Sequence, residues 1–587
     1  MTRSAARAPR RLRGPAREVQ NVDVARILDE IGDLLEIQGG NPFRIRAYRA
    51  AARTIGTLAE PARAVAARGE LDELPGIGAD LAGKITVILE TGTLPLLREL
   101  TRAIPESVVQ MLRIPGLGPK RVKQIHEQLG IRTMAALERA ARAGRLRELP
   151  GIKATIERRV LQGIADLRGH AGRWRLAEAE AYVESLVAHL RASPAVSQIE
   201  VAGSYRRRKD TVGDIDILVS SSRPADVVRR FAAHPRVARV TARGTTRSAV
   251  VLDCGLAVDL RVVPAISFGA ALHYFTGSKP HNIAIRALGV KRGLKINEYG
   301  VFRGTRRTAG RTEAEVYKAV GLPWIAPELR EARGEIEAAR DGRLPRLVEL
   351  TQVRGDLQVH TDATDGVHDL ATMVEAARRL GYEYVAITDH TKAVRVAGGL
   401  SRADFRRQFA AIERLQRREP RIAILKGAEV DILPDGSLDL DDATLAELDV
   451  VVVAVHSSFA LSRAAMTKRI VTALRHPRVH VLAHPTGRLI GTREPYQVDL
   501  AQVIRAAADH GVALEINAQP ERLDLDDVQA RAARDAGVRL VISTDAHRAE
   551  ELGYMRHGVD QARRAWCEAR DVLNTRSLAE LRKALRR

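Results

Sequence analysis

The chain of 587 residues contains only two cysteines, Cys254 and Cys567. Two cysteines exclude a disulfide scaffold and a zinc site built on cysteine, and they fit a reducing cytoplasm. Aromatic residues make up only 4% of the sequence, which argues against the base-stacking surfaces of single-strand-binding proteins. The sequence also lacks any apolar run near the roughly 20 residues that span a bilayer, so we expect no membrane segment.

Positive charge, in contrast, is in large excess, with a net charge of +22. This excess favours a polyanionic partner, nucleic acid first and a membrane surface second, unless it reflects an arginine-rich composition bias. Residues 1–20 are rich in arginine and alanine and have no apolar core, so they do not form a secretory signal. A disordered basic tail is the simplest interpretation, although transit peptides share this composition.

The length is too great for one core, and the residue patterns divide the chain into several parts. Residues 21 to about 175 have the pattern of short helices separated by glycine and proline. Strand patterns begin near residue 196, and the "DCG" at 253–255 is typical of a hairpin turn. From residue 353 onward apolar strands alternate with helices, which indicates βα units around a parallel sheet or barrel.

One short motif occurs three times in the helical part. The copies are "LPGIGADLAGKI" (74–85), "IPGLGPKRVKQI" (114–125) and "LPGIKATIERRV" (149–160). A turn of this kind presents backbone N–H groups beside a helix N-terminus, where a phosphate can bind. The motif resembles the helix-hairpin-helix, which grips DNA phosphates without reading sequence. We expect DNA contacts at Gly76, Gly78, Gly116 and Gly118; the third copy is weakest because Lys153 replaces its second glycine.

The stretch "AGSYRRRKDTVGDIDILVS" (202–220) carries a catalytic pattern. Asp214 and Asp216 are separated by one residue at the start of an apolar strand, so both carboxylates point to one face. Asp259, in "AVDLRVV", adds a carboxylate from a later strand. Three carboxylates can hold two Mg²⁺ or Mn²⁺ ions, one activating a 3′-hydroxyl and one carrying a triphosphate. The pattern therefore predicts nucleotidyl transfer.

In the C-terminal part, residues of ligand type follow each of seven strand-like runs. They are His360 and Asp365, Asp389 and His390, Glu429, His456, His484, Glu515 and Asn517, and Asp545 and His547. In barrel folds the loops at the C-terminal ends of the strands build the site, so these side chains should converge. Histidine with carboxylate suits Zn²⁺, Mn²⁺ or Fe²⁺. A multi-metal cluster in a basic protein would activate water against a phosphoester.

Residues 21 to about 325 resemble the family X DNA polymerases, the group that includes DNA polymerase beta. The resemblance rests on the hairpin repeats and on "NPFRIRAYRAAA", "GSYRRRK", "GDIDILV", "VDLRVV", "YFTGSKPHNIAIR" (274–286) and "LKINEYGVF" (294–302). It implies a metal triad of Asp214, Asp216 and Asp259. It also implies contacts to the incoming nucleotide from Gly203, Ser204, Arg207, Tyr274, Phe275, Gly277, Asn282 and Arg286. Lys279 and His281 differ from polymerase beta, so these contacts need not be identical.

Lys84 falls where some family members keep a lysine that forms a Schiff base and removes a 5′-deoxyribose phosphate. A lysine on a helix is usually a solvated surface residue. A catalytic lysine at this position would need a lowered pKa. Both interpretations stay open at this point.

Residues 353 to about 570 resemble the PHP domain, which is found fused to bacterial family X polymerases. The resemblance implies a distorted (β/α)7 barrel, up to three ions of Zn²⁺ and/or Mn²⁺, and a 3′-5′ exonuclease, 3′-end-cleaning or abasic-site activity. The implied ligands are His360, Asp365, His390, Glu429, His456, His484, Asp545 and His547. Gln358 stands where the family has its first histidine. An amide oxygen is a poorer zinc ligand than imidazole, so either one ion binds weakly or the set prefers Mn²⁺.

The combined prediction is a multidomain α/β protein. Its parts are a basic tail (1–20), an N-terminal helical DNA-binding domain (21–100), a fingers-like helical domain (101–175), a nucleotidyltransferase palm (176–265), a thumb (266–330), a charged helical linker (331–352) and a PHP domain (353–587). We expect a monomeric bacterial repair polymerase, cytoplasmic and nucleoid-associated, that uses dNTPs on gapped or nicked duplex DNA. Three alternatives remain open: a template-independent terminal transferase, a PHP domain that is only structural, and a small phosphoester as the PHP substrate.

Overall fold

The structure is a computed structural model that describes residues 19, 21–56, 58, 62–104, 106–114, 117–169 and 173–586. Residue contacts divide the chain into two compact units, residues 1–169 and 170–587. The predicted basic tail lies outside the described residues apart from Val19. Among the helices of the described ranges, none is both long and apolar enough to cross a membrane.

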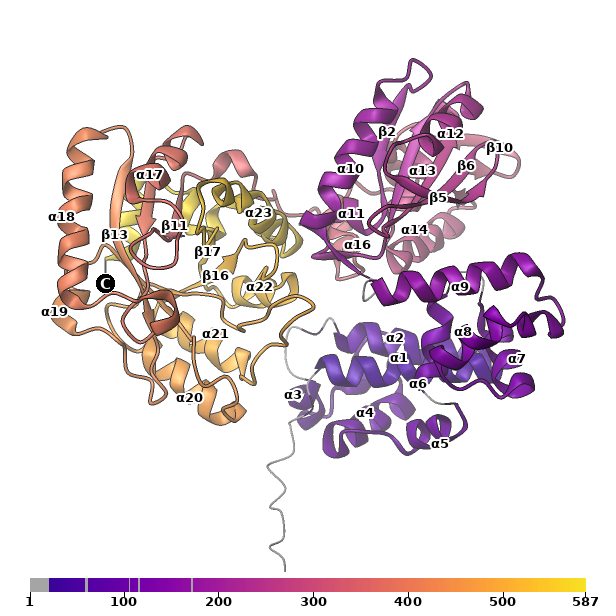
Figure 1. The fold of residues 1–587 in the computed structure, drawn as a ribbon, viewed down its shortest axis with the longest axis horizontal. Helices are drawn as coiled ribbons and strands as arrows, with labels where there is room; N and C mark the ends of the chain where they lie inside the picture. The colour runs from indigo at the N-terminus through magenta and orange to yellow at the C-terminus, as the bar shows by residue number, and fades with distance from the viewer. Residues whose placement is uncertain are drawn as a thin grey trace, which may run out of the picture. The chain divides into compact units, whose positions relative to one another are not determined.

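The first unit is helical throughout its described residues. Its helices are α1 (Asn21–Gln38), α2 (Pro42–Gly56), α3 (Ala62–Ala67), α4 (Ala79–Thr91), α5 (Pro95–Ala103), α6 (Glu106–Val109), α7 (Pro119–Leu129), α8 (Met134–Arg142) and α9 (Ala154–Gly169) (Figure 1). The apolar residues of α1 recur every three or four positions and are buried, as a core-facing helix requires. One hydrophobic core runs from Val24 to Ile164. The predicted boundary near residue 100 therefore falls inside this core.

The three repeated motifs share one backbone hydrogen bond. In each, an apolar N–H donates to the carbonyl three residues earlier: Ile77 to Leu74 at 3.0 Å, Leu117 to Ile114 at 3.0 Å and Ile152 to Leu149 at 3.1 Å. A helix then begins at Ala79, Pro119 or Ala154. Gly76 and Gly151 have φ of 79° and 80°, where a side chain would be strained. The copy with Lys153 thus shares this hydrogen bond with the other two and the positive φ with the first, and Gly116 lies outside the described residues.

The second unit begins with a palm sheet of five strands in the order β2-β4-β7-β6-β5. The strands are β2 (Gln198–Val201), β4 (Asp214–Ser220), β5 (Val237–Arg243), β6 (Arg247–Leu252) and β7 (Ala257–Val263), with the short pair β1 (Trp174–Arg175) and β3 (Thr211–Val212) beside them. Alternate residues of β4 and β7 face a core with α10 (Leu176–Arg191) and α12 (Pro224–Ala232). The predicted hairpin at 253–255 joins β6 to β7. The remaining face of β4 carries Asp214 and Asp216.

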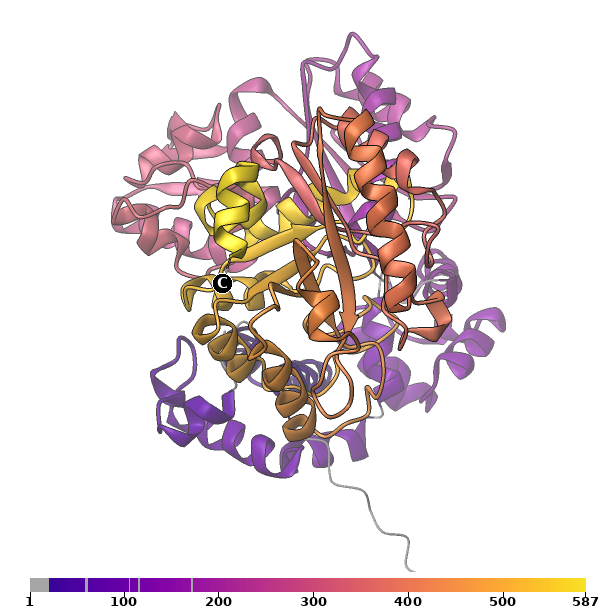
Figure 2. The same ribbon diagram turned by 90° about the vertical axis from the view of Figure 1, so that its left-hand side faces the viewer.

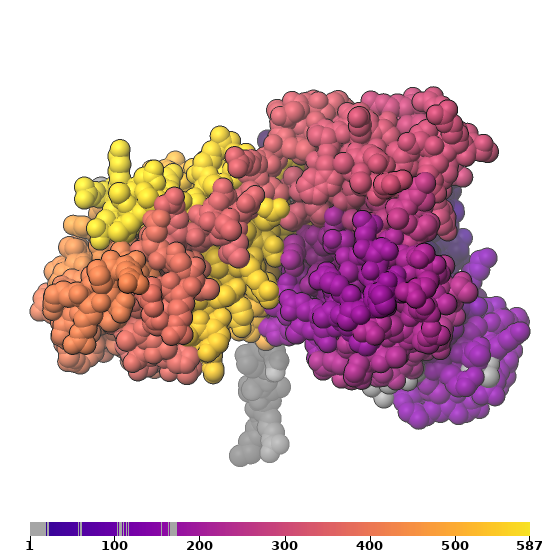
Figure 3. Space-filling model, turned by 90° about the horizontal axis from the view of Figure 1, so that it is seen from above, coloured from indigo at the N-terminus to yellow at the C-terminus, as the bar shows by residue number. Residues whose placement is uncertain are grey.

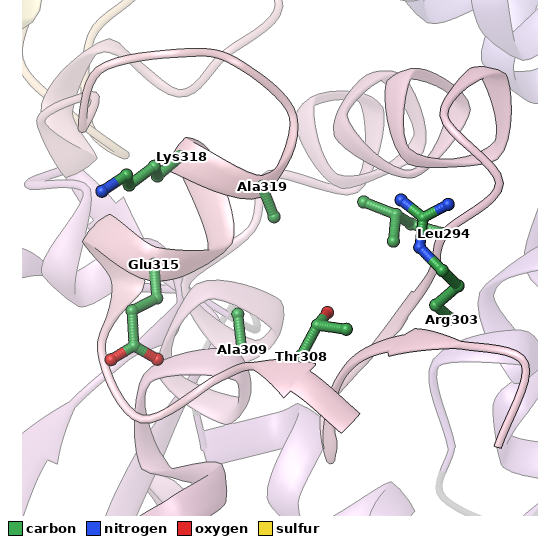
Figure 4. A pocket seen from close by; sticks show the side chains of 7 residues that line it. All are labelled: Leu294, Arg303, Thr308, Ala309, Glu315, Lys318 and Ala319. Atoms are coloured by element: carbon green, nitrogen blue, oxygen red, sulfur yellow. The ribbon is translucent and has the colours of Figure 1, made fainter. Parts of the chain in front are cut away.

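The thumb packs α13 (Phe268–Thr276), α14 (Lys279–Lys291) and α15 (Glu313–Ala319) against an antiparallel sheet of β8 (Lys295–Asn297), β9 (Gly300–Arg303) and β10 (Arg306–Ala309). A pocket of about 330 Å³ opens in the thumb (Figure 4). Its lining residues are Leu294, Arg303, Thr308, Ala309, Glu315, Lys318 and Ala319. None of the predicted site residues is among them, so the pocket does not bear on the predicted chemistry.

The predicted linker, residues 331–352, is packed. Its helix α16 (Glu335–Arg340) buries Glu335 and Ile336, and Leu347 and Val348 are buried after it. The cost of burying the Glu335 carboxylate is offset by its partners. His281 lies 2.6 Å away, and the N–H groups of residues 332 and 333 donate to it. This segment is therefore part of the folded unit and not a free connector.

The PHP domain contains seven parallel strands in chain order, as the sequence predicts (Figures 1 and 2). They are β11 (Gly355–Val359), β12 (Tyr384–Ile387), β13 (Ala423–Asp431), β14 (Val450–Ala454), β15 (Val481–Leu482), β16 (Ala513–Asn517) and β17 (Leu540–Ser543). The helices between and after them are α17 (Leu370–Arg379), α18 (Arg402–Arg418), α19 (Asp442–Leu445), α20 (Arg463–Leu474), α21 (Leu500–Asp509), α22 (Asp527–Asp535), α23 (Met555–Arg564) and α24 (Leu578–Leu585). Alternate strand residues face two separate apolar cores, so both faces of the sheet are buried.

A buried asparagine joins the first strand of this sheet to the last. Asn574 is fully buried, and its Nδ2 donates to the carbonyl oxygens of Gly355 at 2.8 Å and Ile542 at 2.7 Å. Its Oδ1 accepts from the N–H of Ile542 at 3.1 Å. Nearby, Thr544 donates its N–H and hydroxyl to the carboxylate of Asp356. These side chains add to the backbone bridge at the same seam, where the N–H of His360 donates to the carbonyl of Ala546 at 2.9 Å, and together they nearly close the barrel between β11 and β17.

Asn574→Ala should therefore destabilise the PHP domain. The change leaves two carbonyls and one N–H buried without partners, at about 1–3 kcal/mol each, so we expect the free energy of unfolding to fall by about 3 kcal/mol or more. The matched control is Ser437→Ala, which removes an exposed hydrogen bond to Asp435 and should cost less than about 1 kcal/mol. Urea unfolding followed by tryptophan fluorescence measures both. Equal midpoints for the two variants would rule out a closing role for Asn574.

Candidate active sites

The palm brings the predicted carboxylates to one face of its sheet. β4 and β7 pair in parallel, with Asp216 directly opposite Asp259 and Asp214 two residues earlier. The loop after β2 approaches this face closely. A Cβ at Gly203 would lie 2.7 Å from Oδ2 of Asp216, and the φ of Gly203 is 63°. Only glycine allows the backbone to come this close.

The palm carboxylates repel one another in a partly buried setting. Burial and then the charges of Asp214 and Asp259 raise the pKa of Asp216 to about 7. Burial and Asp259 also raise the pKa of Asp214. Oδ1 of Asp259 is buried without a hydrogen bond, and Arg247 lies 3.7 Å from it. Divalent cations held by oxygen ligands relieve such repulsion, so the donor set fits Mg²⁺ or Mn²⁺.

Arg207 connects the loop after β2 to the start of the thumb. This loop carries Gly203 and Ser204 on the short helix α11 (Gly203–Arg206). The Arg207 guanidinium donates to the carbonyl of Thr276, and its Nε donates to Glu331 at 3.0 Å. A Cβ at Gly277 would lie 3.1 Å from Nη1 of Arg207. The structure thus puts three of the expected nucleotide contacts, Gly203, Arg207 and Gly277, around one loop.

The other expected nucleotide contacts lie on α13 and α14. The Tyr274 and Phe275 rings meet edge to face, with centroids 5.2 Å apart. Asn282 donates from Nδ2 to the carbonyl of Tyr274 at 2.7 Å, and Arg286 is exposed one turn later on the same face. His281 is fully buried between Glu335 and the hydroxyl of Tyr317, at 2.6 and 2.9 Å. The difference from polymerase beta at position 281 therefore lies in the thumb core, whereas Lys279 is exposed.

Lys84 lies on α4 with its ammonium 5.6 Å from the centre of the Tyr48 ring. Burial opposes the charged form of this lysine, but the partners Asp80 and Tyr48 outweigh it, so the pKa is raised. A Schiff-base nucleophile must be neutral when it attacks. The described surroundings therefore do not supply the lowered pKa that lyase chemistry requires, and the lyase stays a prediction from resemblance.

The C-terminal ends of the PHP strands bring the predicted ligands together. Three overlapping groups have ligand atoms within 4.8 Å of one another: His360, Asp365, His390 and His547; His390, Glu429 and His456; and His360, Glu429 and Asp545. The eighth predicted ligand, His484, lies with Nε2 2.9 Å from Oε1 of Glu429. Within the described ranges the palm triad forms no group this tight.

Glu429 lies at the centre of these groups. Its carboxylate is 3.2 Å from His360, 3.4 Å from His390 and 3.2 Å from His456, in addition to its contact with His484. Burial alone would raise the pKa of this carboxyl, but the surrounding histidines hold it well below the usual range. Burial likewise opposes the charged form of His456, yet Glu429 and Asp431 raise the pKa of His456 to about 9. The acidic groups therefore attract positive charge into a buried site.

Several buried atoms of the cluster have no hydrogen-bond partner among the described residues. They are both ring nitrogens of His360, Nδ1 of His390, Oε2 of Glu429 and Oε1 of Gln358. Such atoms are costly unless something binds them. Imidazole nitrogens beside carboxylate oxygens form the donor set of Zn²⁺ and Mn²⁺ sites. The residues present thus fit a site for several metal ions.

Several residues of ligand type hold the ligands in place. Asp389 accepts from the N–H and hydroxyl of Thr361 at 2.9 and 2.6 Å, and also from Gln408, so its oxygens are used within the protein. Asn517 donates to Glu515 and to Asp545, at 3.2 and 3.0 Å. These contacts fix the segments that carry His360 and Asp545.

Sequence reasoning missed two residues beside the cluster. Asp431 lies 3.3 Å from Nδ1 of His456 and also accepts that residue's N–H. The sequence feature that could have identified Asp431 is its position at the end of β13, two residues after Glu429. Arg522 has Nε 3.5 Å from Oδ2 of Asp545 and lies in a loop with no strand pattern to mark it.

Gln358 is fully buried, with Nε2 3.5 Å from Oδ1 of Asp545. Its carboxamide therefore lies beside the group of His360, Glu429 and Asp545. The amide oxygen has no hydrogen bond, so position 358 is close enough to matter to any ion held by Asp545.

Comparison with known proteins matches five families to successive segments of the chain. The sequence matches the families "Helix-hairpin-helix domain" over 19–94, "SAM-like Helix-hairpin-helix tandem" over 108–166, "DNA polymerase beta palm" over 173–251, "DNA polymerase beta thumb" over 271–331 and "PHP domain" over 356–519. The tandem match includes the third hairpin copy, in agreement with its turn.

Three relatives cover different parts of the chain. A DNA polymerase/3′-5′ exonuclease PolX from Bacillus subtilis (strain 168) is 37% identical over 96% of this chain and 99% of its own. DNA polymerase lambda of Rattus norvegicus is 25% identical over 53% of this chain and 56% of its own. A probable phosphatase of Thermoanaerobacter sp. (strain X514) is 28% identical over 37% of this chain and 90% of its own. The chain therefore belongs to the family X DNA polymerases that carry a C-terminal PHP domain.

Proposed function

We propose that this protein fills short gaps in DNA by template-directed nucleotidyl transfer and trims 3′ ends with its PHP domain. The observation that carries the proposal is the presence of two separate donor sets in one unit. One is the oxygen-only triad on β4 and β7, and the other is the histidine-rich cluster around Glu429. The substrates are gapped or nicked duplex DNA and dNTPs. Because one chain holds both sites and the hairpins, we propose a monomer that works at the nucleoid in the cytoplasm.

In the palm, Asp214, Asp216 and Asp259 would hold two Mg²⁺ or Mn²⁺ ions. These ions would supply the charge that lowers the pKa of a 3′-hydroxyl and stabilises the leaving pyrophosphate. Gly203 lets the loop backbone reach the phosphates, and Ser204 and Arg207 donate to their oxygens. Tyr274 and Phe275 lie beside the sugar, where bulk excludes a ribose 2′-hydroxyl. Asn282 and Arg286 contact the base pair from α14.

In the PHP domain, the eight ligands from His360 to His547 would hold up to three ions of Mn²⁺ and/or Zn²⁺. Such ions supply a hydroxide nucleophile at neutral pH. The buried carboxylate of Glu429 orients four imidazoles, and Asp389 fixes the turn that carries His360 and Asp365. Arg522 stands at the edge of the cluster, where it can donate to a non-bridging phosphate oxygen. The substrate we propose is the terminal phosphodiester of a DNA 3′ end, with an abasic site as a second one.

Loss of each donor set should remove one activity and spare the other. Asp214→Ala with Asp216→Ala should lower gap filling by at least about a thousand-fold, because both cations lose ligands, and leave 3′-end removal intact. His390→Ala with Asp545→Ala should do the reverse. A gapped, end-labelled duplex incubated with Mn²⁺, with and without dNTPs, reports both rates.

Two surface variants serve as controls. Asp226→Ala removes an exposed palm carboxylate paired with Arg229, and His476→Ala removes a PHP histidine paired with Asp442. Both should retain both activities. If either donor-set variant abolished both activities in a folded protein, the two-site proposal would be wrong. If the variant with His390→Ala and Asp545→Ala lost its metal ions but kept the wild-type rate of 3′-end removal, the result would favour a PHP domain that is only structural.

Template use separates the polymerase from a terminal transferase. We expect faster extension across a one-nucleotide gap than from a single strand of the same sequence, because helix-hairpin-helix motifs like those matched in the first unit grip duplex phosphates. Steady-state extension rates on the two substrates, with all four dNTPs, make the comparison. A preference for the single strand would support the transferase.

Gln358→His should shift the metal preference of the PHP domain toward zinc. Imidazole is the better zinc ligand, and position 358 lies beside Asp545. We expect about ten-fold tighter Zn²⁺ binding in the variant and little change for Gln358→Glu, which keeps an oxygen donor. Elemental analysis after dialysis against mixed Zn²⁺ and Mn²⁺ measures the shift. Identical metal content in all three proteins would show that position 358 is not a ligand position.

A further inference from the structure

The PHP domain and the palm meet through charged groups on the loop that carries the proposed phosphate contacts. In Figure 3 the yellow C-terminal part and the magenta palm meet along a continuous surface. Three residues of the loop between β2 and β4 contact the PHP domain. The carbonyl of Arg207 accepts from Arg564 at 2.6 Å, Arg208 lies 3.5 Å from Asp560, and Asp210 lies 3.4 Å from Arg488.

Arg564 makes the most buried of these contacts. It ends α23, its side chain is only 1% exposed, and its guanidinium also binds Asp527 at 2.6 Å and Glu331 at 3.1 Å. Glu331 in turn accepts from Nε of Arg207 at 3.0 Å. One PHP arginine therefore reaches both ends of Arg207: the backbone carbonyl directly, and the guanidinium through the shared carboxylate.

Each buried carboxylate in this contact is shared between two arginines. Burial alone would raise the pKa of the Glu331 carboxyl, but Arg564 and then Arg207 outweigh it and lower that pKa to about 2. Asp527 is shared in the same way between Arg564 and Arg333, at 2.6 and 2.8 Å. Removal of one member would leave its partners buried and unpaired, so the group holds its geometry as a unit.

This arrangement uses two of the three nitrogens of the Arg207 guanidinium. Nε is taken by Glu331 and Nη1 by the carbonyl of Thr276. Among the described residues none accepts from Nη2, which leaves that group for a ligand. Without Glu331 and Arg564 in place, the long side chain of Arg207 would adopt other rotamers. Binding a phosphate would then cost more side-chain conformational entropy.

We propose that Arg564 of the PHP domain is a positioning residue for nucleotide binding in the palm. It holds Arg207 through its carbonyl oxygen and through Glu331. The polymerase site thus depends on a side chain from the nuclease domain. This inference rests on the proposed role of Arg207 as a triphosphate contact.

The test measures KM for dNTP, kcat and direct dNTP affinity in full-length variants on one-nucleotide gapped DNA. Arg564→Met should raise KM and the nucleotide Kd by about ten-fold, with kcat changed by less than about three-fold. Arg564→Lys should give an intermediate value, because an ammonium keeps the charge without the planar fork. Glu331→Gln should raise KM similarly. The PHP metal content and nuclease rate should stay at wild-type levels.

The neighbouring residue provides a matched control. Arg563 also joins α23 to the polymerase side of this unit, through Glu328 at 2.8 Å and the carbonyl of Val348 at 3.0 Å, but it does not touch the loop of Arg207. Arg563→Gln should leave KM unchanged. An equal rise in KM for Arg563→Gln would mean that any weakened contact between the PHP domain and the polymerase part raises KM. That result would overturn the inference.

Arg207→Ala separates this inference from the proposed function. If Arg207→Ala raises KM while Arg564→Met and Glu331→Gln leave it within about two-fold of wild type, the inference fails and the polymerase proposal stands. If Arg207→Ala leaves KM unchanged, the proposed nucleotide site fails, and the inference fails with it. Loss of the PHP metal and of nuclease activity would reveal that Arg564→Met does not fold. In that case the KM values of Arg564→Lys and Glu331→Gln test the inference against the same two-fold limit.

Discussion

In the palm, the parallel pairing of β4 with β7 puts Asp216 directly beside Asp259, and in the PHP domain the same kind of pairing brings seven strand ends to one rim. Parallel strands end at the same edge, so ligands separated by nearly two hundred residues can meet without any local sequence signal between them. The seam at Asn574 holds the first and last PHP strands in this arrangement. If either strand register slipped by one residue, the carboxylates would move to the opposite face.

Both sites concentrate negative charge within a chain that is strongly basic as a whole. The basic excess suits a polyanionic substrate, while the local acidic groups attract the cations that the chemistry needs. The two sites differ in donor type, because one has only carboxylates and the other mixes carboxylates with imidazoles. This difference is the physical reason to expect different metal preferences within one protein.

Much of this could be predicted from the sequence because the informative residues follow strand patterns. The seven PHP strands, the palm strands around Asp214 and the hairpin at 253–255 are confirmed. The role of Asp389 could not be predicted, because its position at a strand end resembles that of a ligand, and only its contacts with Thr361 and Gln408 show otherwise. The segment 331–352 has the composition of an exposed linker, yet Glu335 is buried beside His281. Charge pairs between distant segments leave no periodic pattern, so Glu331 and Arg564 gave no local signal either.

The position of Asn574 after the palm and after all seven PHP strands affects the order in which the domains form during synthesis. β11, which it holds, precedes it by more than two hundred residues, and Asp545 and His547 also come late. Domains fold from the N-terminus as the chain emerges from the ribosome. The hairpins and the palm strands are therefore complete while the barrel is still open. The nuclease centre therefore assembles after the palm, because Asp545, His547 and Asn574 must all emerge before the barrel can close.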